Sequence, residues 1–404
     1  MRDRKSLEST GAGTDRREFI LRSSKLAVLA LARGALPTGA VLLEMAEARA
    51  ATEAEKKAKA EHVLLFSTTE NANRWPAGKL SKEQSNVTGL LQLKQFVEEE
   101  SKGKIYFDLQ WGGTLGNQIE MPRKLQQGVL AGCHASTQNA AAAATVWNVI
   151  DFPYVLGPVE NFWKLLYSKR INDTLRKKSE EQGLVTLCVF PQIRWIEMRK
   201  GLGFVIRRPE ELKGVKMRVT GSKLEQVAFQ ILPANPTPVA WGEVYNALKD
   251  GTVDGIHVGP APVADYSISD VVGTQTDVEF MYNSDAAYIS TGWFRKLPAA
   301  LQGAVMEAAY RAQVMQHDVY EPYLRDQWGL RPDSPPDTVY KKLNINTVYL
   351  TQKERDVWRD FLSYDRNKAI YDPLIERFGK AEYEAVKQIA STPGPVEKRR
   401  WWKA

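Results

Sequence analysis

The apolar residues of this chain recur with two different periods, and the order of these periods predicts alternating strands and helices. Short apolar or alternating runs predict three early strands, at residues 62–67, 104–110 and 129–133. Helical spacing over 90–100 and 119–127 predicts a helix after each of the first two strands. This β-α-β-α-β order favours a mostly parallel sheet with helices on its faces.

Similar patterns continue and indicate a second β/α set after residue 191. Before it, we expect an alanine-rich helix at 138–147, an amphipathic helix at 159–182 and a strand at 185–190. The second set comprises strands and helices at 215–219, 223–231, 238–239, 241–249 and 253–258. Strand character returns at 288–291, and residues 298–323 and 352–389 are largely helical.

Length and composition favour a two-lobed globular protein. A chain of 404 residues exceeds the size at which one hydrophobic core usually stops growing. The net charge is +7, and residues 1–50 hold nine Lys and Arg against six Asp and Glu. Elsewhere basic and acidic residues are interspersed, whereas a nucleic-acid-binding surface concentrates basic ones. No nucleic-acid partner is therefore expected.

The N-terminus has the pattern of an export signal. Arg16 and Arg17 are followed after one residue by Phe19 and Ile20, then by a moderately apolar stretch over 26–43. Small-residue cleavage sites follow, Ala46-Glu-Ala48 or Ala48-Arg-Ala50. The arginine pair is typical of the twin-arginine type. We expect residues 1–50 to be a twin-arginine signal peptide, read by the twin-arginine export machinery and removed to leave a periplasmic protein.

The alternative for this segment is an N-terminal membrane anchor. A membrane-spanning helix needs about 20 consecutive apolar residues. Lys25, Arg33, Pro37 and Glu44 interrupt the apolar stretch. The sequence therefore favours export with cleavage.

The chain lacks the usual sequence signatures of a catalytic or metal site. Its four histidines, at 62, 134, 257 and 317, form no His-x-x-x-His pair, and Gly112–Gly116 lacks the G-x-G-x-x-G spacing. Two cysteines are too few for a disulfide scaffold or a zinc site. No enzyme activity, metal or cofactor is expected. Cys133 and Cys188 lie in apolar runs, which favours buried free thiols, with a disulfide as the alternative if their strands are neighbours.

One arginine lies inside an apolar alternation. Val215, Met217 and Val219 alternate around Arg218 in a strand-like run. A buried arginine needs an anionic partner. Its planar guanidinium pairs two-to-two with a carboxylate and keeps its charge. Arg218 is therefore a candidate anchor for a small organic acid, and an internal salt bridge to a protein carboxylate is the alternative.

Several short motifs occur in a fixed order behind the export signal. They are Gly113-Thr-Leu-Gly116 with Glu120 and Leu125-Gln-Gln-Gly128, Asp151-Phe-Pro-Tyr154, Pro209-Glu-Glu-Leu-Lys-Gly-Val-Lys-Met-Arg-Val219, Ala234-Asn-Pro-Thr-Pro238, Trp241-Gly-Glu-Val-Tyr-Asn-Ala-Leu248, Val253-Asp-Gly255 and Trp293-Phe-Arg-Lys-Leu-Pro298. Together they resemble the substrate-binding subunit of tripartite ATP-independent periplasmic (TRAP) transporters, the DctP-like family. The resemblance runs from about His62 to Pro322.

The resemblance implies an α/β fold of the two-lobed periplasmic-binding-protein type, with strands crossing between the lobes and a long helix spanning both. The first lobe would comprise residues 60–191 and 284–323, and the second 192–283 and 324–392. The ligand would lie in the cleft between them, and the cleft would close like a hinge. Residues 393–404 form a basic, aromatic tail, interpreted as a frayed end or as a lipid or partner contact.

The resemblance also assigns roles to single residues. Arg218 matches the family's carboxylate-clamping arginine, and Arg194 matches a second basic position after the crossing strand. Trp241 stands where the family has an aromatic residue facing the ligand. The alternatives are a surface arginine near the hinge for Arg194 and a core anchor for Trp241.

His257 marks a departure from the family pattern. Many members carry Gln-Glu-Asn after the Val-Asp-Gly motif, but this chain has Ile256-His257-Val258. His257 could replace the missing polar contact, or it could be a structural histidine. Further candidate ligand contacts lie at expected strand ends or on the returning strand, namely Ser136, Thr137, Asn71 and Tyr288.

The sequence therefore predicts a periplasmic receptor that binds an organic carboxylate and delivers it to a TRAP permease. The ligand could be a mono- or dicarboxylate, a keto acid or an aromatic acid. One alternative is a receptor of another uptake or signalling system, and another is an exported two-lobed hydrolase.

Overall fold

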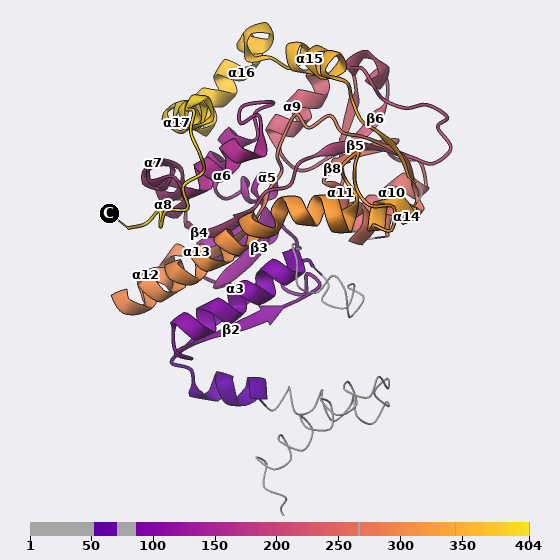
Figure 1. The fold of residues 1–404 in the computed structure, drawn as a ribbon. Helices are drawn as coiled ribbons and strands as arrows, with labels where there is room; N and C mark the ends of the chain where they lie inside the picture. Colours follow the sequence, from indigo (N-terminus) through magenta and orange to yellow (C-terminus); the bar gives the residue numbers. More distant parts are fainter. Residues whose placement is uncertain (1–51, 71–85, 266, 344, 404) are drawn as a thin grey trace, which may run out of the picture. The chain divides into compact units, whose positions relative to one another are not determined.

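Two β-sheets organise the chain, for which a computed structural model describes residues 52–70, 86–265, 267–343 and 345–403 (Figure 1). The predicted signal peptide, with Arg16 and Arg17, and the predicted contact Asn71 lie outside the described residues. The first sheet has the order β2-β1-β3-β10-β4, with β1 at His62–Ser67, β2 at Ile105–Gln110, β3 at Gly132–Ser136, β4 at Leu184–Phe190 and β10 at Asp285–Ser290. The second has the order β11-β9-β5-β8-β6-β7, with β5 at Trp195–Arg199, β6 at Lys216–Val219, β7 at Asn235–Pro238, β8 at Gly255–Val258, β9 at Val272–Thr276 and β11 at Asn346–Val348.

Both sheets are mixed, so the prediction of a mostly parallel sheet is only partly correct. Strand β1 runs parallel to β3, and β6 runs parallel to β7 and β8. Strand β10 is antiparallel to β3 and β4, and β5 is antiparallel to β8 and β9. The antiparallel strands β5 and β10 each come directly after a strand of the other sheet, namely β4 and β9. Their direction follows from the crossing, which the local β/α pattern does not encode.

Helices cover the first sheet and connect its strands. They are α3 at Asn86–Glu100, α4 at Glu120–Gln126, α5 at Thr137–Ala140, the 3-10 helix η2 at Thr145–Ile150, α6 at Val159–Tyr167, α7 at Lys169–Ile171, the π-helical turn η3 at Asn172–Arg176, α8 at Lys177–Glu181, α12 at Thr291–Arg295 and α13 at Ala299–Pro322. Helix α13 packs against α3 and β4 (Figure 1). All seven residues of β4 are buried, which explains its continuous apolar run.

The remaining helices follow the second sheet or the C-terminal part of the chain. They are the 3-10 helices η4 at Pro209–Leu212, η5 at Trp241–Glu243 and η6 at Ile268–Asp270, the α-helices α9 at Lys223–Ile231, α10 at Val244–Lys249, α11 at Pro260–Asp265, α14 at Val339–Leu343, α15 at Gln352–Phe361, α16 at Tyr364–Phe378 and α17 at Lys380–Ser391, and the π-helical turn η7 at Tyr323–Trp328. Helices α16 and α17 contact η2, and α17 also contacts α6. They therefore pack on elements that the sequence assigns to the first lobe.

Three elements differ from the predicted pattern for local reasons. The alanine-rich helix ends at Ala140, and a 3-10 helix begins at Thr145. The expected helix at 159–182 is interrupted at Ser168, which has extended backbone and caps the next turn by accepting a hydrogen bond from Ile171 N at 3.4 Å. Strand β3 begins three residues later than expected, because Val129 lies in the turn before it and is 67% exposed.

One long helical segment connects the two cores. Helix α13 starts on the first sheet and continues through the π-helical turn η7, at Pro322, which has no backbone N–H to donate. Tyr323 and Trp328 then pack into the core of the second sheet with Trp195. This agrees with the expected long helix spanning both lobes.

The C-terminal tail is packed against the first lobe, so the prediction of a frayed end is wrong. Trp401 is fully buried, with its ring 6.4 Å from Tyr167 and 6.0 Å from Tyr310. Arg400 holds the Glu307 carboxylate through Nε and Nη2 at 2.6–3.0 Å. Burial of an aromatic ring outweighs the basic composition from which fraying was inferred.

The two cysteines are free thiols, as predicted. Cys133 and Cys188 are both buried, and strand β10 lies between their strands. Tyr288 of β10 pairs with Cys133 on one side, and Ala287 pairs with Cys188 on the other. Burial raises the pKa of Cys188 to about 12, so its thiol stays protonated.

The chain divides into two compact units, residues 1–63 with 103–106 and residues 64–102 with 107–404. In the described part of the smaller unit, residues 52–59 are helical and His62 N donates to Lys104 O at 3.0 Å. Among the described helices of the chain, none is both long and apolar enough to cross a membrane.

Candidate functional site

Arg218 lies on β6, a strand of the second sheet with neighbours on both sides. Its Cα pairs with Thr237 of β7 and Ile256 of β8. The residue is 2% exposed, and its Nε donates to Val239 O at 3.0 Å. Its guanidinium carbon lies 5.6 Å from the centre of the Trp241 ring. Within the described residues no carboxylate comes within ion-pair distance of it, so the alternative of an internal salt bridge is not observed there.

Burial has a direct effect on the Arg218 charge. Desolvation lowers its pKa to about 10, against the longer-range attraction of Glu225. The side chain remains a cation at neutral pH, but it is poorly solvated. A bound carboxylate would supply the missing counter-charge.

Arg194 lies where the chain crosses from β4 to β5, and it is tied down by protein groups. It is 2% exposed, which excludes the alternative of a surface arginine. Its Nη1 lies 2.6 Å from Glu225 Oε1 and also donates to His257 O. With the Asn283 amide oriented to satisfy both groups, its oxygen accepts from Arg194 Nε at 3.0 Å. The internal salt bridge considered for Arg218 therefore occurs at Arg194.

Glu225 is the centre of this network, and the sequence did not reveal it. It lies in the first turn of α9 and is fully buried. Its Oε2 accepts from Thr220 N and Thr220 Oγ1, each at 2.6 Å. Burial alone would raise its pKa, but Arg194 and His257 lower it to about 2. Glu225 is therefore an ionised carboxylate that holds Arg194 and the end of β6 in place.

His257 lies behind the arginines, away from the cavities described below. Its Nδ1 is 3.0 Å from Glu225 Oε1, and its ring stacks on Phe280 at 4.4 Å with an interplanar angle of 2°. Burial lowers its pKa to about 4, so the imidazole is neutral at pH 7. Nδ1 is then the atom that carries the proton and donates to Glu225. This position matches the structural alternative considered for His257.

Two adjoining cavities open beside Arg218. The smaller, of about 40 Å³, is also lined by Arg194, and the larger, of about 460 Å³, extends past Trp241 to the glycine turn at 112–116. Both cavities are lined by Gln118, Asn139, Arg218 and Trp241. We call the two together the cleft. Its walls come from loops after β2 and β3 on one side and from β6 and η5 on the other.

Polar side chains that the sequence analysis did not single out line the smaller cavity. They are Glu70, Gln118, Asn139, Gln192, Asn283 and Asp285. Asn139 Nδ2 and Ser136 N both donate to Gln118 Oε1 at 3.0 Å, which fixes that amide. The signal that could have found Asn283 and Asp285 is their position at the second crossing, where Asn283 lies between β9 and β10 and Asp285 begins β10.

Of the other described residues predicted to contact the ligand, Ser136 lines the cleft, whereas Thr137 and Tyr288 do not. Ser136 lines the smaller cavity and caps α5 by accepting from Asn139 N at 3.2 Å. Thr137 and Tyr288 are fully buried and line neither cavity of the cleft. The structure thus brings Arg218, Arg194, Trp241 and Ser136 together and leaves Thr137, Tyr288 and His257 behind the cavity wall.

The chemistry of the cleft is that of a binding site for an anion with a polar body. It offers the Arg218 guanidinium, an indole face, amides and two carboxylates. Across the described ranges, no three His, Cys, Asp or Glu side chains gather as ligands for a metal ion.

Comparison with known proteins shows the family to which the chain belongs. Residues 77–326 match the family model for bacterial extracellular solute-binding protein, family 7, also called DctP. A solute-binding protein of Sulfitobacter sp. NAS-14.1 is 26% identical over 258 residues, which are 61% of this chain and 75% of that protein. The C4-dicarboxylate-binding periplasmic protein DctP of Rhodobacter capsulatus is 23% identical over 300 residues, 74% of this chain and 85% of that protein.

The fold of the chain is also similar to that of solved TRAP periplasmic solute-binding proteins. A TRAP periplasmic solute-binding protein from Ralstonia eutropha H16, with bound (S)-2-acetolactate, superposes with a TM-score of 0.68 at 21% identity. The match covers 81% of this chain and 98% of that one. The two sheets, the crossing strands and the long helix are therefore those of the two-lobed TRAP binding proteins. With more than half of its length matched by the family model, this chain belongs to family 7 of the bacterial extracellular solute-binding proteins, the DctP family.

Proposed function

We propose that this protein is a periplasmic receptor that captures a small organic carboxylate in the cleft and delivers it to a TRAP-type permease. The observation that carries the proposal is Arg218. It is buried, it lines both cavities of the cleft, and within the described chain it has no carboxylate within ion-pair distance. A ligand carboxylate is the partner that this environment lacks.

The other residues of the cleft have complementary roles in the proposal. Trp241 covers the body of the ligand, since its ring borders both cavities. Arg194 adds positive potential but is already paired with Glu225, so it supports the anchor and does not replace it. Glu70 and Asp285 line the smaller cavity and can accept hydrogen bonds from ligand hydroxyl groups.

The known ligands of the relatives are consistent with this class. The Rhodobacter protein is named for C4-dicarboxylates, and the Ralstonia structure holds a hydroxylated keto acid. The acidic groups of the smaller cavity favour a hydroxy or keto monocarboxylate over a dicarboxylate, because a second ligand carboxylate would meet like charges there.

The proposed location and partners of the protein rest on the export pattern of its N-terminal sequence and on its family. We propose export through the twin-arginine machinery, removal of residues 1–50 and function in the periplasm. The receptor would meet the membrane subunits of a TRAP transporter there, and it would perform no chemistry on its ligand.

Titration calorimetry against a panel of hydroxy, keto, dicarboxylic and aromatic acids tests the proposal. For the acid that binds, Arg218→Ala should weaken affinity at least a hundredfold, because a desolvated bidentate pair is lost. Arg218→Lys should also lose at least tenfold, since an ammonium cannot reproduce the planar fork. Mass spectrometry of ligand carried through purification would identify the natural acid.

Arg199→Ala is the matched control. Arg199 lies on β5 of the same sheet, pairs with Asp254 at 3.2 Å and does not line the cleft. Its replacement should leave affinity unchanged. Equal affinity of wild type and Arg218→Ala would remove Arg218 from the site and with it the proposed binding mode.

A further inference from the structure

The two cavities of the cleft differ greatly in size, and Arg218 lines both of them. The smaller measures about 40 Å³ and the larger about 460 Å³. An apolar cavity of about 150 Å³ is enough to hold a benzene ring. A ring therefore fits only in the larger cavity, whereas the smaller has room for a small substituent such as a hydroxyl group. A carboxylate bound to Arg218 would lie next to both.

The walls of the larger cavity are mostly uncharged. Among its described lining residues, Arg218 alone carries a charge. Apolar and aromatic side chains supply much of the rest, namely Ile119, Pro238, Val239, Trp241, Tyr245 and Ile268. An indole and a phenol beside aliphatic side chains favour a ligand body that is aromatic or otherwise apolar.

The polar side chains of the larger cavity are already engaged with protein groups. Both lone pairs of Gln118 Oε1 are used, because it accepts from Ser136 N and Asn139 Nδ2 at 3.0 Å. Gln118 Nε2 donates to Thr69 Oγ1 at 3.1 Å, and Asn117 Oδ1 accepts from two backbone N–H groups at 2.9 Å. A body with many hydroxyl groups would have to compete with these bonds, so a sugar-like body is disfavoured.

The smaller cavity favours a hydroxyl group on the ligand. Its carboxylates, Glu70 and Asp285, are hydrogen-bond acceptors. Donors around it already point at protein acceptors, since Arg194 Nη1 lies 2.6 Å from Glu225 Oε1 and Gln192 Nε2 donates to Asp285. A ligand hydroxyl can donate to a carboxylate there, whereas a keto oxygen would need a donor.

We propose that the ligand is a 2-hydroxy acid with an apolar body at least as large as a benzene ring, a proposal that rests on the proposed function of the cleft. The carboxylate pairs with Arg218, the hydroxyl group lies in the smaller cavity, and the body lies in the larger one against Trp241. In such an acid these three groups are attached at one carbon atom, just as the two cavities adjoin at Arg218.

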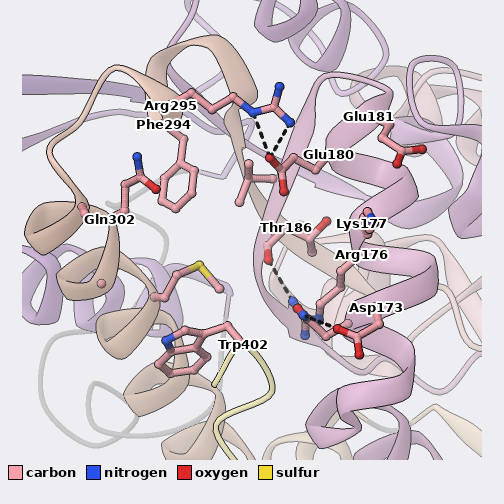
Figure 2. Close-up of a pocket in the computed structure, with 15 residues that line it drawn as sticks. Asp173, Arg176, Lys177, Glu180, Glu181, Thr186, Phe294, Arg295, Gln302 and Trp402 are labelled. Atoms are coloured by element: carbon pink, nitrogen blue, oxygen red, sulfur yellow. Dashed lines mark hydrogen bonds and ion pairs between the residues drawn. The ribbon is translucent and has the colours of Figure 1, made fainter. Parts of the chain in front are cut away.

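A cavity of similar size elsewhere on the chain has different walls and provides a control. It lies between α8, β4 and α13 and has a volume of about 540 Å³ (Figure 2). We call it the rear cavity. Lys177, Glu180, Glu181 and Arg295 line it, and Figure 2 shows Arg295 holding Glu180 through Nε and Nη2, at 3.1 and 2.8 Å. These charged groups would lose water to an apolar ligand body, which makes the rear cavity unfavourable for one.

Titration calorimetry on the full mature chain with three 2-hydroxy acids tests the nature of the body. 3-Phenyllactate, lactate and gluconate share the 2-hydroxy carboxylate and differ in what is attached to it. 3-Phenyllactate should bind at least tenfold more tightly than either of the others, because its ring is removed from water.

Two related acids test the hydroxyl group. 3-Phenylpropionate and phenylpyruvate keep the ring and the carboxylate but have no hydroxyl donor at the second carbon. Each should bind at least tenfold more weakly than 3-phenyllactate, because a hydrogen bond to a charged group is lost.

Gly221→Leu tests the place of the body. Gly221 lines the larger cavity and not the smaller one. The first side-chain carbon added there would lie 3.2 Å from Ile119 Cδ1 and 4.0 Å from Asn139 Oδ1, so a leucine projects into the larger cavity. The preference for 3-phenyllactate over lactate should fall at least tenfold.

Gly303→Leu is the matched control, because it adds the same side chain in the rear cavity. Gly303 lines that cavity, and a first side-chain carbon there meets no atom within 4 Å. The preference for 3-phenyllactate over lactate should equal that of the wild type. A loss in Gly303→Leu as large as in Gly221→Leu would move the ring out of the cleft and overturn the proposal.

Three further results would overturn it. They are lactate or gluconate binding as tightly as 3-phenyllactate, equal affinity for the acids with and without the hydroxyl group, and an unchanged preference in Gly221→Leu. Each of these leaves the receptor function in place as long as some acid binds and Arg218→Ala weakens its affinity. Failure of the receptor function gives a different result, in which no acid binds or Arg218→Ala has no effect, and this proposal then falls with it.

Discussion

In the part of the chain that the structure describes, three arginines are almost completely buried, and their partners separate their roles. Arg194 has the Glu225 carboxylate at 2.6 Å, whereas Arg176 and Arg218 have hydrogen bonds to backbone carbonyls. Taking a charge out of water costs several kcal/mol unless a counter-charge is close. The paired arginine therefore supports the structure, whereas Arg218, which lines the cleft, is the arginine that we propose as the ligand anchor.

Glu225→Gln tests the supporting role. Glutamine keeps the size and one acceptor but leaves Arg194 buried without its counter-charge, so the free energy of unfolding should fall by about 3 kcal/mol at pH 7. The pKa of Glu225 is lowered to about 2 in the folded protein, from an ordinary 4.5. A lowered folded pKa stabilises the protein above the unfolded value and loses that contribution as pH falls through the folded one.

Urea denaturation between pH 7 and pH 2 measures the difference in the free energy of unfolding between wild type and Glu225→Gln. It should be constant above about pH 4.5 and disappear toward about pH 2, where the wild-type carboxylate is protonated in both states. Equal stability of wild type and variant at pH 7 would contradict the pairing of Glu225 with Arg194.

His257→Gln tests the neutral state of the buried imidazole. Its folded pKa is about 4, below the ordinary 6.5, so the unfolded chain takes up a proton first as pH falls. Unfolding should therefore become easier between about pH 6.5 and pH 4, by up to about 3 kcal/mol from this group. Chemical denaturation across that range should give a shallower pH dependence for the variant, and an unchanged slope would assign the acid sensitivity to other groups.

The same residues explain what sequence reasoning could and could not find. Arg218 was predictable because a charged residue in the apolar alternation of Val215, Met217 and Val219 is locally anomalous. Glu225 was not, because a glutamate in the first turn of a helix usually faces solvent. Arg176 was hidden in a Leu-Arg-Lys-Lys run, where nothing distinguishes the buried cation from its exposed neighbours.

At the scale of elements, local periodicity predicted where helices and strands occur better than it predicted the direction of the strands or the elements that each one contacts. The helix at Lys223–Ile231 was predicted with its observed bounds, because Ser222 caps it and its apolar face repeats with helical spacing. Strand β5 was missed as a strand, since its residues Trp195–Arg199 follow a crossing whose geometry is set by the second sheet. The tail was misjudged because its packing depends on Tyr167 and Tyr310, far away in sequence.

The tail gives the clearest prediction for an element. Trp401→Ala removes a fully buried indole from between Tyr167, Tyr310 and Arg176, so the free energy of unfolding should fall by about 3–5 kcal/mol. Trp402→Ala is the matched control, because Trp402 is only partly buried, and it should cost less than about 1 kcal/mol. Urea midpoints measure both, and a wild-type midpoint for Trp401→Ala would mean that the tail is detached in solution.

At the scale of the whole chain, the cleft is assembled at the two crossings between the sheets. Arg194 lies on the path from β4 to β5, Asn283 lies on the path from β9 to β10, and Asp285 is the first residue of β10. A site built there draws residues from both sheets, so it can form only after the two sheets have folded together. That requirement fits the proposed twin-arginine route, in which the protein folds before it crosses the membrane.

Export of the precursor is the prediction that belongs to the complete chain. Replacing both Arg16 and Arg17 with lysine keeps the charge of the N-terminal region but removes the paired guanidinium groups that the receptor of this route reads. Cell fractionation should then find the protein in the cytoplasm and not in the periplasm. The matched control replaces Arg2 and Arg4 with lysine, an equal change outside the pair, and should leave periplasmic protein at the wild-type level. Unchanged export of the Arg16, Arg17 variant would assign the signal to the general secretory route, and the receptor would then have to complete its folding, including the site at the two crossings, after translocation.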